Sequence, residues 1–140
     1  MSSGLSGDNI VTLKDANEVP LAALAKDATF RSKGYDVGRS DKFGVEVEVA
    51  GSAGTSPTVT VTVDISFDNG TTWQPYPVGV NSATQAALAA IAGNGNEWEI
   101  WDTLVPSGAL VSFLFTFGGT SPSGNVTARL IQKRTRVAEV

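Results

Sequence analysis

The sequence predicts an all-β chain, an antiparallel β-sandwich of jelly-roll type with an extended N-terminal arm. Apolar and polar residues alternate over several segments of strand length, glycine-rich turns separate these segments, and only one short segment has a helical pattern. A parallel α/β fold would need helices between successive strands, which this pattern does not provide. With 140 residues, the chain is long enough for one domain with a hydrophobic core.

Residues 1–26 predict an extended N-terminal arm, because Ser, Gly, Ala and Asp are frequent there and the apolar residues show no sustained period. The β-sandwich domain is expected over residues 27–133, followed by a basic C-terminal tail over residues 134–140. The first residues lack a basic start and an apolar run of signal-peptide length, so we expect the chain to be made in a cytoplasm. No membrane partner is expected, since the longest strongly apolar stretch, residues 109–117, has about half of the roughly 20 residues that span a bilayer.

Two neighbouring segments have the clearest strand pattern. Residues 43–50 (FGVEVEVA) place valines on one face and Glu46 and Glu48 on the other, which indicates a half-buried strand. Residues 57–66 (PTVTVTVDIS) alternate in the same way. Because the glycine-containing segment 51–56 joins them, we predict that the two strands form a hairpin.

The middle of the chain has mixed signals. Residues 73–80 predict an edge strand or a loop crossing, because Pro75 and Pro77 cannot donate ladder hydrogen bonds. Residues 82–95 (SATQAALAAIAGNG) combine a capping residue, an alanine-rich run and following glycines, so we predict one short helix there, with a helical surface loop as the alternative. The remaining predicted strands are residues 29–31, 97–101, 109–117 and 125–132.

Residues 97–101 (EWEIW) form a predicted strand whose alternation indicates which of its tryptophans is exposed. Their alternation places Trp98 and Ile100 on one face, and Trp101 on the face of the two glutamates. We therefore expect Trp101 to be exposed and to lie at a partner interface. A sugar-binding surface is the alternative use of such an indole.

The charges are unevenly distributed along the chain, whose formal net charge is −4. Residues 43–128 contain seven acidic residues and no basic one. Nucleic acid is therefore not expected as a partner, since phosphate binding needs a broad basic surface. An acidic body with a basic end suits docking between complementary protein surfaces, although a solvated face with an incidental basic end explains it equally well. The candidate contacts at this end are Arg129, Lys133, Arg134 and Arg136.

Cysteine and histidine are both absent, which excludes disulfides, thiolate nucleophiles and the commonest general base and metal ligand. A carboxylate mechanism would need two acids across a cleft. Glu97 and Glu99 share one strand face, but the solvent face of any sheet can have this pattern. No D-x-D-x-D-G loop for calcium is present. We expect no enzymatic activity, no metal and no cofactor.

One local motif is specific. Residues 66–73 (SFDNGTTW) match the Asp-box, S-x-D-x-G-x-T-W, at every fixed position. Physically, the Ser and Asp side chains can bond to the backbone of the turn, the glycine supplies positive φ, and the tryptophan packs on the turn. In sialidases the motif is a fold-stabilising hairpin, and one copy cannot make a propeller. We predict a structural hairpin, with sugar contact as the alternative, formed by Ser66, Asp68, Gly70, Thr72 and Trp73.

Several phrases together resemble a known group of proteins: a GTSP loop, a PTVTVTV strand, the SFDNGTTW hairpin and a late FTFGGTSPSGNVTARL segment. Over roughly residues 35–132 the chain resembles small β-sandwich proteins encoded among the head and tail genes of tailed bacteriophages. The resemblance implies a virion structural protein, first of all a decoration or cement protein on the capsid surface. Its implied partners are the major capsid protein and further copies of itself, with a trimer favoured. A tail or neck protein and a carbohydrate-binding module for host adhesion are the alternatives.

Overall fold

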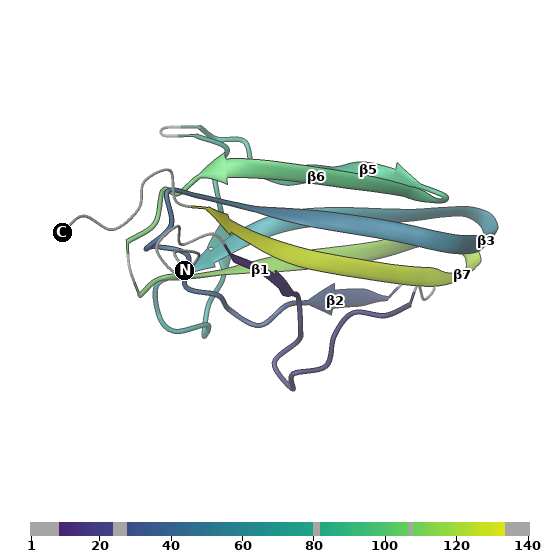
Figure 1. Ribbon diagram of the computed structural model, residues 1–140, viewed down its shortest axis with the longest axis horizontal. Coiled ribbons are helices and arrows are strands. Elements are labelled where there is room, and N and C mark those ends of the chain that lie inside the picture. The colour runs from purple at the N-terminus through teal and green to yellow at the C-terminus, as the bar shows by residue number, and fades with distance from the viewer. Residues whose placement is uncertain (1–8, 24–27, 80–81, 107, 134–140) are drawn as a thin grey trace, which may run out of the picture.

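A computed structural model describes residues 9–23, 28–79, 82–106 and 108–133 (Figure 1). Every pairing between its strands is antiparallel, and the described residues contain no helix. The predicted antiparallel β-sandwich of jelly-roll type is confirmed. The strands are β1 (Asn9–Thr12), β2 (Thr29–Arg31), β3 (Lys42–Ser66), β4 (Gln74–Pro75), β5 (Ala87–Ala92), β6 (Gly95–Asp102) and β7 (Leu110–Lys133).

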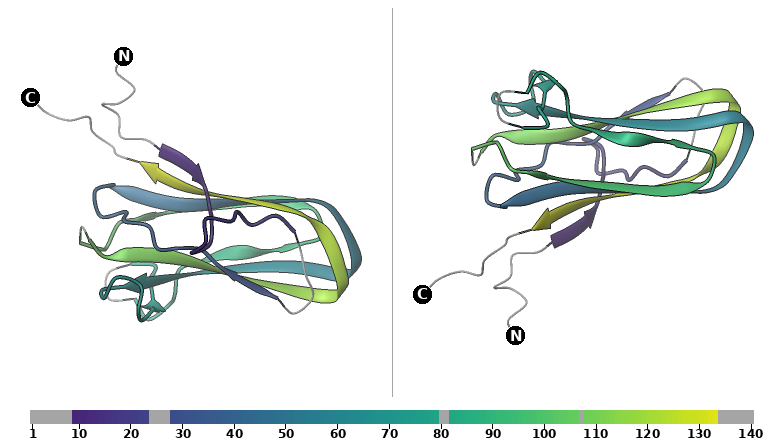
Figure 2. Two further views of the ribbon diagram at one scale, coloured as in Figure 1. Left: turned by 90° about the horizontal axis from the view of Figure 1, so that it is seen from below. Right: turned by 90° about the horizontal axis from the view of Figure 1, so that it is seen from above.

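Two long strands, β3 and β7, form the frame of the sandwich. They pair from Lys42 with Lys133 at one end to Ser66 with Leu110 at the other. Both strands bend in the middle and curl round one end of the molecule (Figure 2). Each strand therefore contributes its two halves to two different layers.

The shorter strands complete the two layers. In the first layer, called the β6 sheet, the first half of β3 pairs with β6 and the second half of β7 pairs with β1. In the second layer, called the β5 sheet, the second half of β3 pairs with β5 and β4, and the first half of β7 pairs with β2. The two short edge strands β1 and β2 thus lie on the same side of the sandwich (Figure 1).

The hydrophobic core lies between these two sheets. Phe43 of β3 packs across it against Phe113 of β7, with ring centroids 6.4 Å apart, and against Tyr76 at 5.2 Å. Burying one such side chain fully contributes about 1.5–3 kcal/mol by removing it from water. The largest fully buried side chains are Tyr76, Phe43, Phe113, Phe115, Leu13 and Leu130.

The predicted hairpin between residues 43–50 and 57–66 is wrong. These segments do not pair with each other; they are the two halves of β3, and each pairs with β7. Segment 51–56 is a bend with left-handed backbone at Gly51, Gly54 and Ser56, so it carries the strand into the other sheet instead of reversing it. The sequence GTSP occurs at residues 54–57 and again at 119–122. The two copies lie side by side, because Thr55 pairs with Thr120.

The helix predicted over residues 82–95 is also wrong, because this segment contains β5 and the start of β6. Leu88 and Ile91 pair with Val61 and Val59 of β3, with a register shift between the two pairs. An extra residue in β5 thus lets two positions three apart face the same core. The i, i+3 spacing that indicated a helix is produced by this β-bulge.

The region after the Asp-box behaves as the prolines predict. β4 has two residues, the second of which is Pro75, and pairs with β3. Pro77 follows two positions later. Between these prolines Tyr76 is buried; its hydroxyl donates to the Asp102 carbonyl at 2.6 Å and accepts from the Leu104 N–H at 2.9 Å. Burial raises the pKa of Tyr76. These bonds fix the loop after β6 against the core.

The described part of the N-terminal arm lies along the sandwich. It is extended, as predicted, but β1 pairs with β7, and the side chains of Leu13 and Leu21 are buried in the core. Residues 9–23 therefore belong to the folded body. The segment then leads through β2 to residues 31–35, where the candidate site is found.

Candidate functional site

The two tryptophans of β6 have the reverse of the expected orientations: Trp101 faces the core and Trp98 faces solvent. Trp101 is only 7% exposed and Trp98 is 60% exposed. The register explains the reversal, because Trp101 lies opposite Phe43, which faces the core at 5.7 Å between ring centroids. The two glutamates do share the face of Trp101, as predicted, but this is the inner face at the open edge of the sheet. The expected exposure of Trp101 is therefore wrong.

The basic residues near the C-terminus do not form one described patch. Arg129 forms an ion pair with Glu46 of β3, with a nitrogen–oxygen distance of 2.9 Å. Lys133 is exposed at the end of β7, opposite Lys42. Arg134 and Arg136 lie outside the described residues, so the structure does not place the predicted docking tail.

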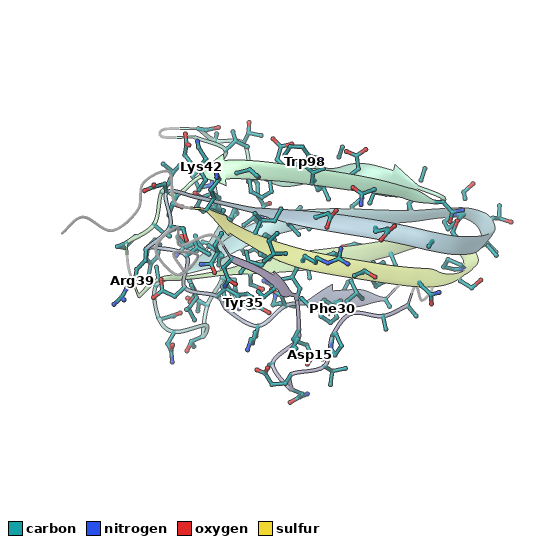
Figure 3. The ribbon with its side chains drawn as sticks, in the orientation of Figure 1. Asp15, Phe30, Tyr35, Arg39, Lys42 and Trp98 are labelled. Carbon is teal, nitrogen blue, oxygen red and sulfur yellow. The ribbon has the colours of Figure 1, made fainter. Side chains whose placement is uncertain are left out.

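The outer face of the β6 sheet carries exposed apolar side chains. Ile10 is 65% exposed, and Trp98 also projects into solvent (Figure 3). The strand register aligns the outward positions in rows across the sheet. One row contains Ile10, Ile131, Gly44 and Ile100, and the next contains Thr12, Arg129, Glu46 and Trp98.

The Asp-box forms the turn that its sequence predicts, between β3 and β4. The Ser66 hydroxyl accepts from the Gly70 N–H at 2.8 Å and donates to the Asp68 carboxylate at 2.7 Å. That carboxylate also accepts from the Thr72 N–H at 2.9 Å and from its hydroxyl at 2.6 Å. These bonds to the charged form, first those from Thr72 and then that from Ser66, lower the pKa of Asp68 from 3.8 to about 2. Left-handed backbone at Asn69 and Gly70 closes the turn.

A cavity of about 320 Å³ lies beside this turn. It is lined on one side by the Asp-box and on the other by the segment that follows β2. The indole of Trp73 is half-buried in its wall. The lining residues with polar or aromatic groups are Arg31, Ser32, Lys33, Asn69 and Trp73. The turn predicted to be structural is therefore also one wall of a cavity.

A network of hydrogen bonds fixes Arg31 in this wall. Its guanidinium donates to Asp64 at 2.9 Å and to the Ser112 hydroxyl at 3.2 Å, and lies over the ring of Trp73 at 5.3 Å from the centroid. Asp64 also accepts from the Gln85 amide at 2.9 Å. Since Asp64 and Ser112 are buried, these bonds satisfy groups that would otherwise be costly to bury. The guanidinium and the indole are thus held as one preorganised pair.

A second cavity, of about 300 Å³, is also lined by Lys33, so the two cavities adjoin at this residue. The Lys33 ammonium donates to Glu18 at 2.7 Å and lies 5.6 Å from the ring centroid of Tyr35. This ion pair raises the pKa of Lys33 and lowers that of Glu18. The further lining includes Lys14 and β1 residues such as Asn9. Both cavities therefore lie along the side of the sandwich that carries β1 and β2.

The walls of the two cavities contain few acidic side chains. The first cavity has no carboxylate among its lining residues, and the second has one, Glu18, which is bound to Lys33. Among the described residues, no group of three or more acidic residues is placed to hold a metal ion. No helix among them is long and apolar enough to cross a bilayer. The wall offers hydrogen-bond donors, cations and aromatic rings.

Sequence reasoning missed most of this site. Of the residues that line the first cavity, it singled out Gly70 and Trp73, through the Asp-box. Arg31 and Lys33 lie in a segment whose only pattern is a three-residue strand. The one signal that could have found them is that these two cations come shortly before residues 43–128, which contain no basic residue. The strand pairing is still needed to show that they lie beside the Asp-box.

Solved structures with a similar fold include modules from polysaccharide-degrading enzymes and a viral protein. The CBM22-1–GH10 modules of endo-1,4-β-D-xylanase 10B from Clostridium thermocellum, complexed with xylohexaose, align over 96% of this chain at 11% identity and TM-score 0.48; the chain spans 26% of that chain's length. The C-terminal CBM6 of LamC, a laminarinase from Zobellia galactanivorans, aligns over 89% of this chain and 90% of its own at 12% identity and TM-score 0.43. A chain of infectious bursal disease virus, Gx strain, aligns over 90% of this chain and 32% of its own at 8% identity and TM-score 0.42.

At these identities and TM-scores, the likeness concerns the β-sandwich fold alone. No protein-family model matches the sequence, and no curated protein matches it.

Proposed function

We propose that this chain is a non-catalytic carbohydrate-binding module, and that the cavity beside the Asp-box is its binding site. The observation that carries the proposal is the combination of the Trp73 indole with the side chains of Arg31, Lys33 and Asn69 in one cavity. A sugar ring has an apolar face of C–H groups and an edge of hydroxyls. The first packs on an aromatic ring, and the second accepts from and donates to fixed polar groups.

The size and rigidity of the cavity support this proposal. A volume of about 320 Å³ is at the lower end of the range of about 300–1,000 Å³ for small-molecule sites. Arg31 is already fixed by Asp64 and Ser112, so a ligand would not have to order it. The cavity wall lacks the pair of opposed carboxylates that glycoside hydrolysis uses, which favours binding without cleavage.

The proposal is tested by the affinity of the full chain for a panel of oligosaccharides, measured by titration calorimetry. We expect Trp73→Ala to weaken binding of any ligand found by at least tenfold, because the stacking surface is lost. Trp98→Ala is the matched control and should bind as the wild type does. An unchanged affinity in Trp73→Ala, or no oligosaccharide bound by the wild type, would overturn the proposal.

A second variant guards against local unfolding of the turn. Asn69→Gly removes an amide from the cavity and keeps a residue that accepts the left-handed backbone at this position. We expect its melting temperature to stay near that of the wild type and its affinity to fall severalfold. Equal affinity in this variant would remove Asn69 from the site.

A second candidate function is favoured by the outer face of the β6 sheet. We propose, as this second candidate, that the face with Ile10 and Trp98 contacts another protein surface. Exposed apolar side chains on one face of a sheet are suited to such contact. A virion decoration protein bound to the major capsid protein, alone or as a homo-oligomer, would use such a face, and so would a tail or neck protein.

This candidate is tested by light scattering of the purified chain and by co-sedimentation with assembled capsid shells. We expect stoichiometric sedimentation with the shells, lost in the double variant Ile10→Ser, Trp98→Ser. A monomer that does not sediment with shells would count against a role in the virion. Sugar binding through Trp73 would be unaffected by either result.

A further inference from the structure

The two adjoining cavities have a shared chemical pattern. In the first, the Arg31 guanidinium lies over the ring of Trp73 at 5.3 Å, and in the second the Lys33 ammonium lies over the ring of Tyr35 at 5.6 Å. Each cavity thus contains one pair of a cation and an aromatic ring. Because Lys33 lines both cavities, the two pairs follow one another along a single wall.

This wall is basic in a chain that is acidic overall. Its lining includes the cations Lys14, Arg31 and Lys33 and the carboxylate of Glu18. Because Arg31 is paired with Asp64, the three cations exceed the two carboxylates by one. The formal net charge of the whole chain is −4. Within the described part of the chain, the ammonium of Lys14 has no ion-pair partner. The charge of this wall therefore favours an anionic ligand over a neutral one.

A carboxylate of the chain already binds Lys33, the residue that lines both cavities. Glu18 has left-handed backbone, with φ of 64°, and its carboxylate lies 2.7 Å from Lys33. The loop that presents it is held by Asp15, which accepts from the N–H groups of Asn17 and Val19, and it protrudes beside β1 and β2 (Figure 3). Both partners of the ion pair are exposed, and exposed pairs of this kind are weak, so a ligand carboxylate can replace Glu18.

We infer that the two cavities form one groove for a linear polysaccharide with carboxylate groups, in which Lys33 binds a carboxylate at the junction while Trp73 and Tyr35 pack against sugar rings on either side. This inference rests on the proposed carbohydrate-binding function and names its ligand class. Glu18 then acts as a competitor within the chain, since it holds the position that the ligand carboxylate takes. The ligand is a polymer of uronic acids, because such a chain repeats a ring and a carboxylate along its length.

The experiment compares ligands that differ only in charge. The affinity of the full chain is measured for hexamers of galacturonate and of mannuronate, and for the methyl esters of both. We expect at least one acid to bind severalfold more tightly than its ester, with a preference that falls as salt concentration rises. Equal affinity for acid and ester in both series would overturn the inference.

Three variants locate the effect. Lys33→Met should abolish the preference for the acid, whereas Glu18→Gln should raise affinity for the acid severalfold and leave affinity for the ester unchanged. Lys42→Met is the control, because it removes a cation that lines neither cavity and is paired with Asp102 of β6. A preference retained in Lys33→Met would overturn the inference.

The failure of the inference and that of the proposed function give different results. If acid and ester bind equally and Trp73→Ala abolishes both, the carbohydrate-binding module stands and the uronate groove is excluded. If neutral oligosaccharides bind through Trp73 and both acids fail to bind, the carbohydrate-binding module again stands and the uronate groove is again excluded. If no oligosaccharide of either kind binds, both proposals are overturned.

Discussion

Trp98 is exposed and Trp73 is half-buried, and the two side chains differ in the groups that surround them. Trp98 lies on the outer face of the β6 sheet and offers apolar area. Trp73 lies in a cavity wall, with Arg31 fixed over its ring and the amide of Asn69 nearby. Area alone favours contact with many surfaces, whereas a ring among fixed polar groups can select one ligand. Exposure by itself is thus a poor guide to the binding site.

The largest expected effect on the free energy of unfolding comes from a change at Trp101, the third tryptophan. It tests whether β6 has one face in the core and one in solvent. Trp101→Ala should lower the free energy of unfolding by about 3–5 kcal/mol, because it leaves a cavity beside Phe43 in the core. Urea unfolding followed by circular dichroism measures this loss. A loss below about 1 kcal/mol would show that Trp101 is not a core residue.

A smaller effect tests the rigidity of the cavity beside Trp73. Arg31→Met should lower the free energy of unfolding by about 1–3 kcal/mol, since buried Asp64 loses its cation and Ser112 a donor. Lys42→Met is the control, because its ion pair with Asp102 is exposed and worth about 0–1 kcal/mol. If the two variants are equally stable, the Arg31 network does not order the cavity.

The Asp-box turn gives the stability of the fold a pH dependence. The pKa of Asp68 is about 2 in the folded chain and 3.8 ordinarily, so its ionised form stabilises the fold above pH 3.8, and this contribution is lost as pH falls through about 2. Asp68→Asn has no such charge to protonate. We expect its melting temperature to fall less than that of the wild type between pH 4 and pH 2. Parallel melting curves over this range would contradict the assigned hydrogen bonds.

The smallest effect is expected on the outer face of the β6 sheet. Trp98→Ala should change the free energy of unfolding by no more than about 0.5 kcal/mol, because the indole is 60% exposed. The same urea experiment measures it. A loss comparable to that of Trp101→Ala would mean that Trp98 is covered in solution, as by another copy of the chain.

The sequence predicts the strands well because the alternating valines of β3 must face one core. It does not show that β3 continues through segment 51–56, since glycine and serine with left-handed backbone are equally typical of hairpin loops and of bends. The inner or outer assignment of Trp101 fails for a related reason. Alternation groups residues on one face, but only the register with Phe43 shows which face is buried.

The candidate site is predicted only in part. The Asp-box is visible because all its bonds are local in sequence, from Ser66 to Thr72. The opposite wall depends on Arg31 meeting Asp64 and on Lys33 meeting Glu18, and these contacts join segments without a shared pattern. The predicted arm contributes Lys14 and Glu18 to this wall, so a segment that seemed structureless builds part of the site.

The continuous course of β3 and β7 through both sheets has a consequence for how the chain folds. The first residue of β3 pairs with the last of β7, so the frame closes only when distant parts of the chain meet, and such topologies fold slowly, in about milliseconds to seconds. Neither layer can be completed without fixing strands that also belong to the other. The two sheets should therefore form and melt in one cooperative transition, with no stable half-sandwich between.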